Sequence, residues 1–274
     1  FEHTLWLDDQ PDGVLYVNDV LYKYKGKMSP NTTIVIRKEV VSVTSKAFYG
    51  CDSLASIVLP DGITSINDEC FSGCSSLQSI VMPKTVERIG SSAFFGCSSL
   101  DTLALPNGIQ LIGCRAFAGC NSLTTLFLPP NLQLLGKEAF RDCSVLRSVD
   151  IPSALTSVPD SAFLNCTMLT SLKLSDGVCA IGKSAFANCS SLKSVTLPAS
   201  IKTIGDKAFW GCERLGHIFS LSENPAHLLG EFQFPESLRA IHVPRAAVRF
   251  YKQKWVSYLD FFRGEKDINA TSQR

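Results

Sequence analysis

The stretch AFFGCSSLDTLALP, residues 93–106, decides the architecture, because it returns 23 residues later as AFAGCNSLTTLFLP, residues 116–129. The same spacing holds without interruption for the phenylalanine row Phe48, Phe71, Phe94, Phe117, Phe140, Phe163, Phe186 and Phe209. A cysteine follows each of these three residues later, from Cys51 to Cys212. A fixed period of 23 residues lies in the range of leucine-rich repeats and predicts a one-dimensional stack of coils.

Each repeat has four parts, and the first is a strand of the form Leu-x-x-Ile-x-Leu-Pro, as in residues 54–60. Its alternation of apolar and small polar residues places Ile57 and Leu59 toward the core. The proline ends the strand because it cannot donate a ladder hydrogen bond. A turn, a short extended return such as residues 63–66, and the Ala-Phe-x-Gly-Cys corner follow. We therefore predict a β-rich, right-handed leucine-rich-repeat solenoid with a parallel sheet on one face and short helical corners.

The corner contains a row of residue types that tolerate a positive φ. The residue before each repeated cysteine is Gly50, Gly73, Gly96, Gly119, Asp142, Asn165, Asn188 or Gly211. Glycine, asparagine and aspartate at one position predict a left-handed backbone that closes the corner. A second glycine row receives the same interpretation, with Pro159 marking one turn that must differ; its members are Gly90, Gly113, Gly136, Gly182 and Gly205.

The N-terminal segment, residues 1–30, departs from the repeat. Residues 1–12 are polar and receive no predicted element. Two β-branched and aromatic runs flank Asn18-Asp19, and they predict a hairpin over residues 13–25. This hairpin is expected to cover the open end of the stack, since a first coil has no neighbour to bury its core face.

The solenoid is assigned to residues 31–244 and the C-terminal cap to residues 245–274. The register persists through Phe232 to the strand motif that ends at Pro244. Apolar positions three and four residues apart then predict one cap helix over residues 245–260. The polar residues 263–274 are expected to be frayed.

Composition excludes several classes of function. The 274 residues include 26 basic and 25 acidic side chains, and this near balance argues against nucleic acid or an anionic membrane as the main partner. No apolar run approaches the ~20 residues needed to span a bilayer, and no signal peptide opens the chain. Residues 1–4 are interpreted as the cut end of a longer protein, with a signal or lipoprotein segment expected upstream.

The repeat unit carries a family likeness. The pattern Ala-Phe-x-Gly-Cys-x-Ser-Leu-x-x-Ile-x-Leu-Pro-x-x-Ile-x-x-Ile-Gly resembles the BspA-like, or Treponema-type, leucine-rich repeat over residues 31–244. The hairpin and the aromatic C-terminal segment are similar to end caps of bacterial members. The resemblance implies an exported solenoid with a role in adhesion or protein binding, in some members to host matrix proteins. It implies no ligand identity and no catalytic residues.

The cysteine row has two interpretations. Stacked cysteines would lie ~5 Å apart, which is within disulfide range, so a disulfide ladder or a metal site is one possibility. The favoured interpretation is a column of small buried groups with reduced thiols, because in-register side chains point the same way and no histidine stands at ligand spacing. Cys114 and Cys179 lie outside the row and are expected to be exposed and unpaired.

No motif predicts catalysis, a cofactor or a metal. His217 and His242 fall on strand positions that face outward, but no motif places a nucleophile or a carboxylate beside them. The protein is therefore predicted to be non-enzymatic. A hydrolase remains a hypothesis, and turnover in a broad esterase and glycosidase screen would support it.

The outward face of the sheet is the candidate binding site, and two rows of residues lie on it. The first row is nearly all hydroxyl, which favours a structural ladder of cross-strand hydrogen bonds: Ser56, Ser79, Thr102, Thr125, Ser148, Ser171, Ser194 and His217. The second row varies, as recognition positions do: Val58, Val81, Ala104, Phe127, Asp150, Lys173, Thr196 and Phe219. From it we predict Val81, Phe127, Asp150, Lys173 and Phe219 as ligand-binding residues, with Asp150 and Lys173 able to pair. Ordinary surface variation or a dimer contact is the alternative.

The family resemblance implies a cell-surface or secreted protein that binds a protein or glycan, with host extracellular matrix among the expected ligands. Composition predicts that it binds no nucleic acid and inserts into no membrane. The alternative is a structural spacer without a ligand. A basic cluster near the C-terminus is expected to be the solvated face of the cap helix, or else a site for an acidic glycan or a membrane surface: Arg239, Arg245, Arg249, Lys252 and Lys254.

Overall fold

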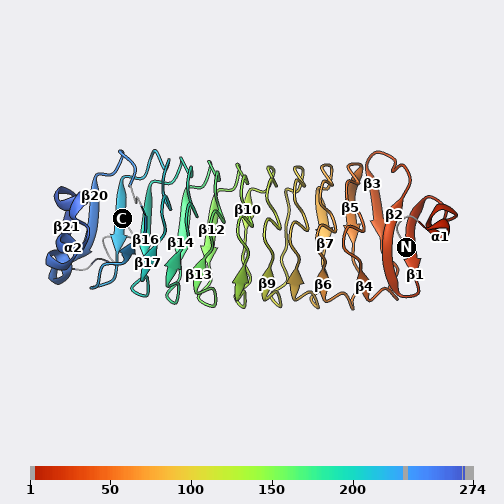
Figure 1. Cartoon of the computed structure of the whole chain (residues 1–274), viewed down its shortest axis with the longest axis horizontal. Helices are drawn as coiled ribbons and strands as arrows, with labels where there is room; N and C mark the ends of the chain where they lie inside the picture. The colour runs from red at the N-terminus through yellow and green to blue at the C-terminus, as the bar shows by residue number, and fades with distance from the viewer. Residues whose placement is uncertain (1–3, 231–233, 267, 269–274) are drawn as a thin grey trace.

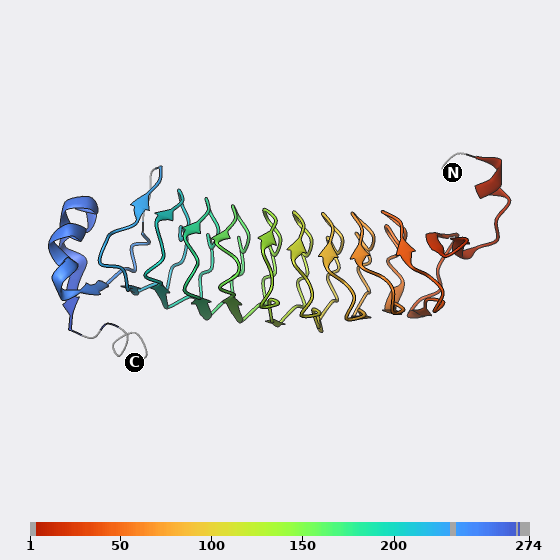
Figure 2. The ribbon, with the colours of Figure 1, turned by 90° about the horizontal axis from the view of Figure 1, so that it is seen from below.

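The chain folds into an elongated solenoid in which each coil contacts only its neighbours (Figure 1). The structure is a computed structural model and describes residues 4–230, 234–266 and 268. Phe232, which the sequence places in the repeat register, lies outside these residues. Figure 2 shows the coils side by side along the array, with helices only near its two ends.

The Leu-x-x-Ile strands form a first parallel ladder along one face. Strands pair one repeat apart within three successive sheets, so that Ile57 lies opposite Ile80 and Val149 opposite Leu172; the described pairing is interrupted before Thr125 and between Leu174 and Ser194. A single bridge between Ser79 and Thr102 replaces a strand in one coil. The strands are β3 (Thr32–Val35), β5 (Leu54–Val58), β7 (Ser79–Val81), β10 (Thr125–Leu126), β12 (Ser148–Ile151), β14 (Ser171–Leu174), β16 (Ser194–Leu197), β18 (His217–Ser220) and β20 (Ala240–Pro244).

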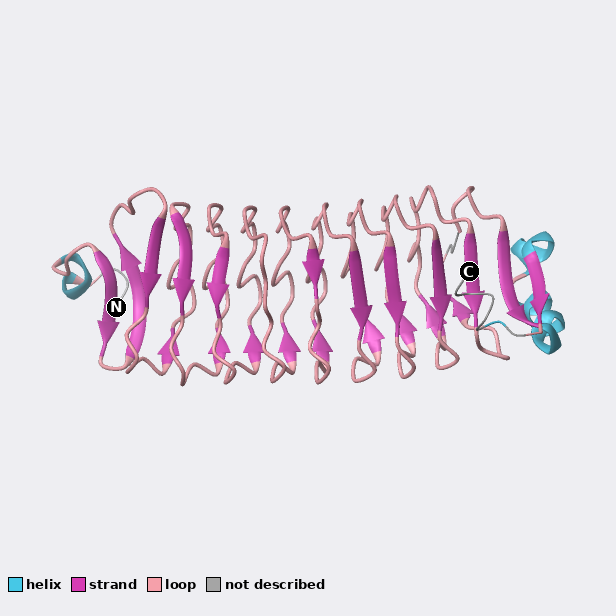
Figure 3. Cartoon of the chain, turned by 180° about the vertical axis from the view of Figure 1, so that it is seen from behind, coloured by secondary structure: helices cyan, strands magenta, loops and turns pink. Residues whose placement is uncertain are grey.

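The extended returns form a second tier of two-residue parallel strands, called here the second ladder, which Figure 3 shows apart from the first. It consists of two four-stranded sheets, and its first strand, β4 (Ser42–Val43), pairs with the N-terminal hairpin instead. The sequence predicts the extended returns, and the structure adds their pairing with one another, as between Ile66 and Ile89. The strands are β4 (Ser42–Val43), β6 (Ser65–Ile66), β8 (Arg88–Ile89), β9 (Leu111–Ile112), β11 (Leu134–Leu135), β13 (Ser157–Val158), β15 (Ala180–Ile181), β17 (Thr203–Ile204) and β19 (His227–Leu228).

Phenylalanine rings stack through the centre of the array as predicted. Neighbouring rings of the row lie nearly parallel, with centroids 5.0 Å apart for Phe94 and Phe117 and 5.2 Å apart for Phe117 and Phe140. All eight rings are fully buried. The coils are thus held by a continuous aromatic column that only an unbroken period can build.

The cysteine row lies beside this column and is free of disulfides. All eleven cysteines fall within the described residues and are unpaired; Cys114 is exposed as predicted, whereas Cys51 and Cys179 are half-buried. The row does more than fill space, because seven of its thiols donate hydrogen bonds of 3.1–3.4 Å to phenylalanine carbonyls of the preceding coil. Cys143, for example, donates to the carbonyl of Phe117.

The two glycine rows have different causes. Every member of the row before the cysteines has a positive φ, from Gly50 at 69° to Gly211 at 71°, which confirms the left-handed corner. The interpretation of the second row is wrong, because its glycines have ordinary φ values. They are required by close packing: a Cβ on Gly113 would lie 2.5 Å from the backbone nitrogen of Ser91 in the preceding coil.

The N-terminal segment contains one helical turn that the sequence does not predict, α1 (Leu5–Asp8). Trp6 packs edge-on against Tyr22, and the ammonium of Lys25 donates hydrogen bonds to the carbonyls of Leu7 and Asp8 at the end of this turn. The predicted hairpin is present as β1 (Gly13–Val17) and β2 (Val20–Lys25), which pair antiparallel. Strand β2 also pairs with β4 of the solenoid.

The prediction of a single C-terminal helix over residues 245–260 is wrong. The segment is divided into η1 (Arg245–Ala247), α2 (Val248–Lys254) and η2 (Val256–Phe261). The backbone leaves helical geometry at Trp255, whose φ of −106° and ψ of 57° let its ring pack at 5.2 Å on Tyr251. The described part of the tail is not frayed either, since β21 (Phe262–Glu265) pairs in parallel with β20.

Candidate functional site

The outward side of the first ladder, here called the sheet face, carries an apolar strip. Val35, Val58 and Val81 lie opposite one another in register and Ala104 and Phe127 continue the row. The Phe127 ring is 80% exposed, although most aromatic rings in the array are buried. Val35 extends the strip beyond the predicted residues, and the half repeat at Ile34 was the signal that could have found it. Contiguous exposed apolar side chains of this kind often mark an interface.

A charged pair follows the apolar strip. Asp150 and Lys173 lie directly opposite each other in β12 and β14, and both side chains are exposed. Among the residues the structure describes, these two side chains form no ion pair within 4.0 Å, either with each other or with another charged group. The predicted pairing is therefore not made, and one carboxylate and one ammonium face solvent beside Phe127.

Phe219 differs from the other predicted site residues, since its ring is only 9% exposed. It stacks on the imidazole of His242 with centroids 4.4 Å apart. Nδ1 of His242 donates a 2.7 Å hydrogen bond to the Glu265 carboxylate, and its Nε2 lies 3.2 Å from Nδ1 of His217. The sheet face is thus closed near its C-terminal end by a stack of rings.

The role of Glu265 is not evident from the sequence, because its polar segment shows no periodic pattern that predicts a strand. Strand β21 brings this carboxylate to the two histidines that no motif had linked to an acidic residue. Partial burial lowers the pKa of His217, with the positive charge of His242 and Arg239 acting in the same direction. Among the described residues, no serine, threonine or cysteine side chain is hydrogen-bonded to either histidine, whose bonds join them to each other and to Glu265.

The predicted hydroxyl ladder does not form along its row. Ser56 donates a 2.9 Å hydrogen bond to the hydroxyl of Thr33, one coil before the row begins, and among the described residues no two hydroxyls of the row itself are hydrogen-bonded to each other. Thr102, Thr125, Ser171 and Ser194 are exposed. The hydroxyl of Thr102 donates a 2.9 Å hydrogen bond to the neighbouring Asp101 carboxylate, whereas the other three face solvent. Cross-strand hydroxyl bonds are not needed to space the strands, because the backbone hydrogen bonds already do so.

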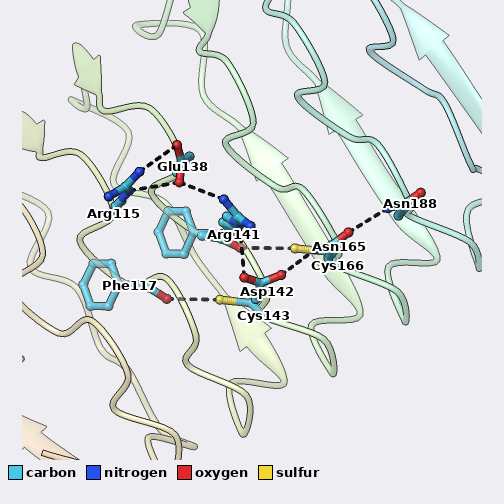
Figure 4. A network of polar contacts seen from close by, with 10 residues as sticks. Arg115, Phe117, Glu138, Arg141, Asp142, Cys143, Asn165, Cys166 and Asn188 are labelled. Carbon is cyan, nitrogen blue, oxygen red and sulfur yellow. Dashed lines mark hydrogen bonds and ion pairs between the residues drawn. The ribbon is translucent and has the colours of Figure 1, made fainter. Parts of the chain in front are cut away.

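A polar network crosses the corners of four coils (Figure 4). Glu138 accepts hydrogen bonds from Arg115 and Arg141, and the one from Arg115 lowers the pKa of this carboxyl against the effect of partial burial. Beyond it, Asn165 donates to Asp142 and Asn188 donates to Asn165. These groups are paired with one another, which indicates a role in joining coils.

Neither a metal site nor a membrane-spanning helix is found among the described residues. No group of three histidine, cysteine or acidic side chains among them has a geometry that holds a metal ion. No helix among them has the length and apolar composition needed to cross a bilayer. The basic cluster lies on exposed positions of η1, α2 and the residue preceding β20.

The comparisons with known proteins agree with the repeat. The family model described as the BspA type leucine rich repeat region matches residues 22–144, 97–216 and 136–246. This chain belongs to that family. A comparison with curated proteins gives no match.

Solved structures of bacterial repeat proteins are similar to the chain. A leucine-rich repeat protein from Bacteroides ovatus is 29% identical with a TM-score of 0.71, and the match covers 77% of this chain and 55% of that one. A leucine-rich repeat protein of Treponema pallidum is 32% identical with a TM-score of 0.59, covering 63% of this chain and 82% of that one. This chain thus spans about half the length of the Bacteroides protein. Its fold is typical of non-enzymatic repeat proteins.

Proposed function

We propose that the chain is a non-enzymatic binding module, displayed at the cell surface or secreted, whose sheet face holds a protein partner. The Phe127 ring carries this proposal, because it is 80% exposed whereas the rings of the repeated phenylalanine row are fully buried. The apolar strip supplies area that favours burial against a partner. The free charges of Asp150 and Lys173 at its border supply orientation and selectivity.

Its location is supported by family likeness. A protein of the same fold from Faecalibacterium prausnitzii, with a TM-score of 0.53 and 23% identity, bears the description of a leucine rich cell surface protein. Proteins of the extracellular matrix are therefore suitable first probes. A rigid spacer with no ligand of its own is the competing function.

The test is binding of the purified chain to immobilised fibronectin, laminin and collagen by surface plasmon resonance. Phe127→Ser with Lys173→Glu is expected to weaken binding by about tenfold or more, as when central anchors of an interface are removed. Leu134→Ser is the control, because Leu134 is also a large exposed apolar residue but lies on the second ladder. Equal effects of the two variants, or no binding by the unaltered chain, would favour the spacer.

A further inference from the structure

Two adjoining hollows near the C-terminal end of the array are distinct from the sheet-face strip. The first, of about 380 Å³, is lined by Lys193, Arg214 and Arg239 together with Glu213. The second, of about 560 Å³, is lined by Trp210 and Glu236 and shares Glu213 and Ser237 with the first. The two hollows adjoin at Glu213 and Ser237 and are here together called the depression, with a cationic part and an aromatic part.

The cationic part contains a glycine between two cationic residues at one repeat position. Lys193, Gly216 and Arg239 hold the same position in three successive coils, because the backbone N–H of Gly216 donates to Lys193 and that of Arg239 donates to Gly216. Two long side chains thus flank a position without one, and Arg214 joins them from the same side. A Cβ on Gly216 would lie 3.7 Å from Cδ of Arg239, so the Arg239 side chain extends over the glycine, and the hollow beside it has room for a small anionic group.

The charges in this part are not neutralised by the protein. Lys193, Arg214 and Arg239 are exposed, and within the described ranges none of them makes an ion pair within 4.0 Å. The imidazole of His217 borders the same hollow. Like charges gathered at one place repel one another, and an anion bound among them relieves that repulsion.

The aromatic part has a different chemistry. The indole of Trp210 is 51% exposed, on the corner position that small residues such as Ala118 and Ala187 occupy in other coils. An exposed indole offers a flat apolar face on which the C–H face of a pyranose ring packs. The carboxylates of Glu213 and Glu236 beside it accept hydrogen bonds but donate none, so they suit hydroxyl groups.

We propose that this depression binds an acidic oligosaccharide. A carboxylate or sulfate of the sugar lies among Lys193, Arg214 and Arg239, the adjacent ring stacks on Trp210, and its hydroxyls donate to Glu213 and Glu236. A nucleic acid fits less well, because its regularly spaced phosphates would meet these two carboxylates and the chain carries a net charge of only +1. The site is independent of Phe127 and of the proposed protein partner.

The experiment compares three tetrasaccharides by isothermal titration calorimetry: one of galacturonate, one derived from heparin and neutral maltotetraose. The acidic probes distinguish carboxylate from sulfate recognition. We compare Trp210→Ala with Phe95→Ala, which removes an exposed ring at the same corner position of another coil. We compare Lys193→Ser/Arg239→Ser with Arg147→Ser, which removes an exposed cation at the same strand position two coils away.

We expect binding of at least one acidic tetrasaccharide, weakened by added salt, and none of maltotetraose. Trp210→Ala and the double variant should each weaken it by about tenfold or more, while Phe95→Ala and Arg147→Ser leave it unchanged. Failure of both acidic probes, equal binding of maltotetraose, or equal effects of test and control variants would overturn the proposal. So would equally tight binding of oligoglutamate or a tetranucleotide that Trp210→Ala does not weaken.

Discussion

At the scale of single residues, the stability of the array depends on the phenylalanine column. Phe117 is fully buried and stacks on Phe94 and Phe140, so its loss leaves a cavity bounded by two other rings. Phe117→Ala is expected to lower the free energy of unfolding by about 3–5 kcal/mol. Urea denaturation followed by circular dichroism measures this change.

The neighbouring corner residue provides the control for Phe117. Phe95 is exposed and takes no part in the column, so Phe95→Ala should change the free energy of unfolding by about 0.5 kcal/mol or less. Similar losses for Phe117→Ala and Phe95→Ala would contradict the stacked column.

Backbone conformation at the corner could be predicted only where the residue types restrict it. Asp142, Asn165 and Asn188 replace glycine at one repeat position in three consecutive coils, and their φ values of 59–64° agree with the prediction. A second row of positive φ two residues before each phenylalanine was missed, since its members include Lys46, Ser92 and other residues without this signature. There the stacking of coils imposes the conformation, and a single sequence does not record that cause.

At the scale of elements, the distance between coils is limited by the second glycine row. A Cβ on Gly113 would lie 2.5 Å from the nitrogen of Ser91, whereas one on Gly96 meets nothing within 4 Å. Gly96→Ala should cost about 1–2 kcal/mol through its positive φ alone. Gly113→Ala should cost more, because it must separate two coils whose backbones are in contact.

Chemical denaturation of both glycine variants measures this difference. Hydrogen exchange of the amides in β8 and β9 reports whether the coils separate locally, and it should rise in Gly113→Ala but not in Gly96→Ala. A smaller loss of stability in Gly113→Ala than in Gly96→Ala would refute the role assigned to close packing.

The repeated elements and the N-terminal hairpin could be predicted from the sequence, and the C-terminal end could not. The strands recur because proline and alternating apolar residues recur, and Val81, Phe127, Asp150 and Lys173 lie exposed on the sheet face where the pattern places them. Phe219 follows the same pattern but is covered by His242, which Glu265 holds from β21. That strand has no alternation to reveal it, and it forms only because the last coil offers an open edge.

At the scale of the whole molecule, the thiol column makes stability depend on pH. Burial raises the pKa of Cys97, Cys143 and Cys212 to about 12, and it raises the pKa of Cys120, Cys166 and Cys189 well above the ordinary value. An unfolded chain exposes these thiols, whose ordinary pKa is about 8.5. Above that pH the unfolded state releases protons that the folded state retains, so alkaline conditions favour unfolding.

The free energy of unfolding should therefore be constant up to about pH 8 and fall as the pH rises toward 12, by up to about 1.4 kcal/mol per pH unit for each buried thiol. Urea titrations under reductant between pH 7 and about 9.5 test this before lysines lose their charge. Cys97→Ala should reduce the slope by one thiol, whereas Cys114→Ser should leave it unchanged because Cys114 is exposed in the folded chain. A flat profile, or equal slopes for these two variants, would mean that the thiols of the column ionise as readily in the folded chain as in the unfolded one.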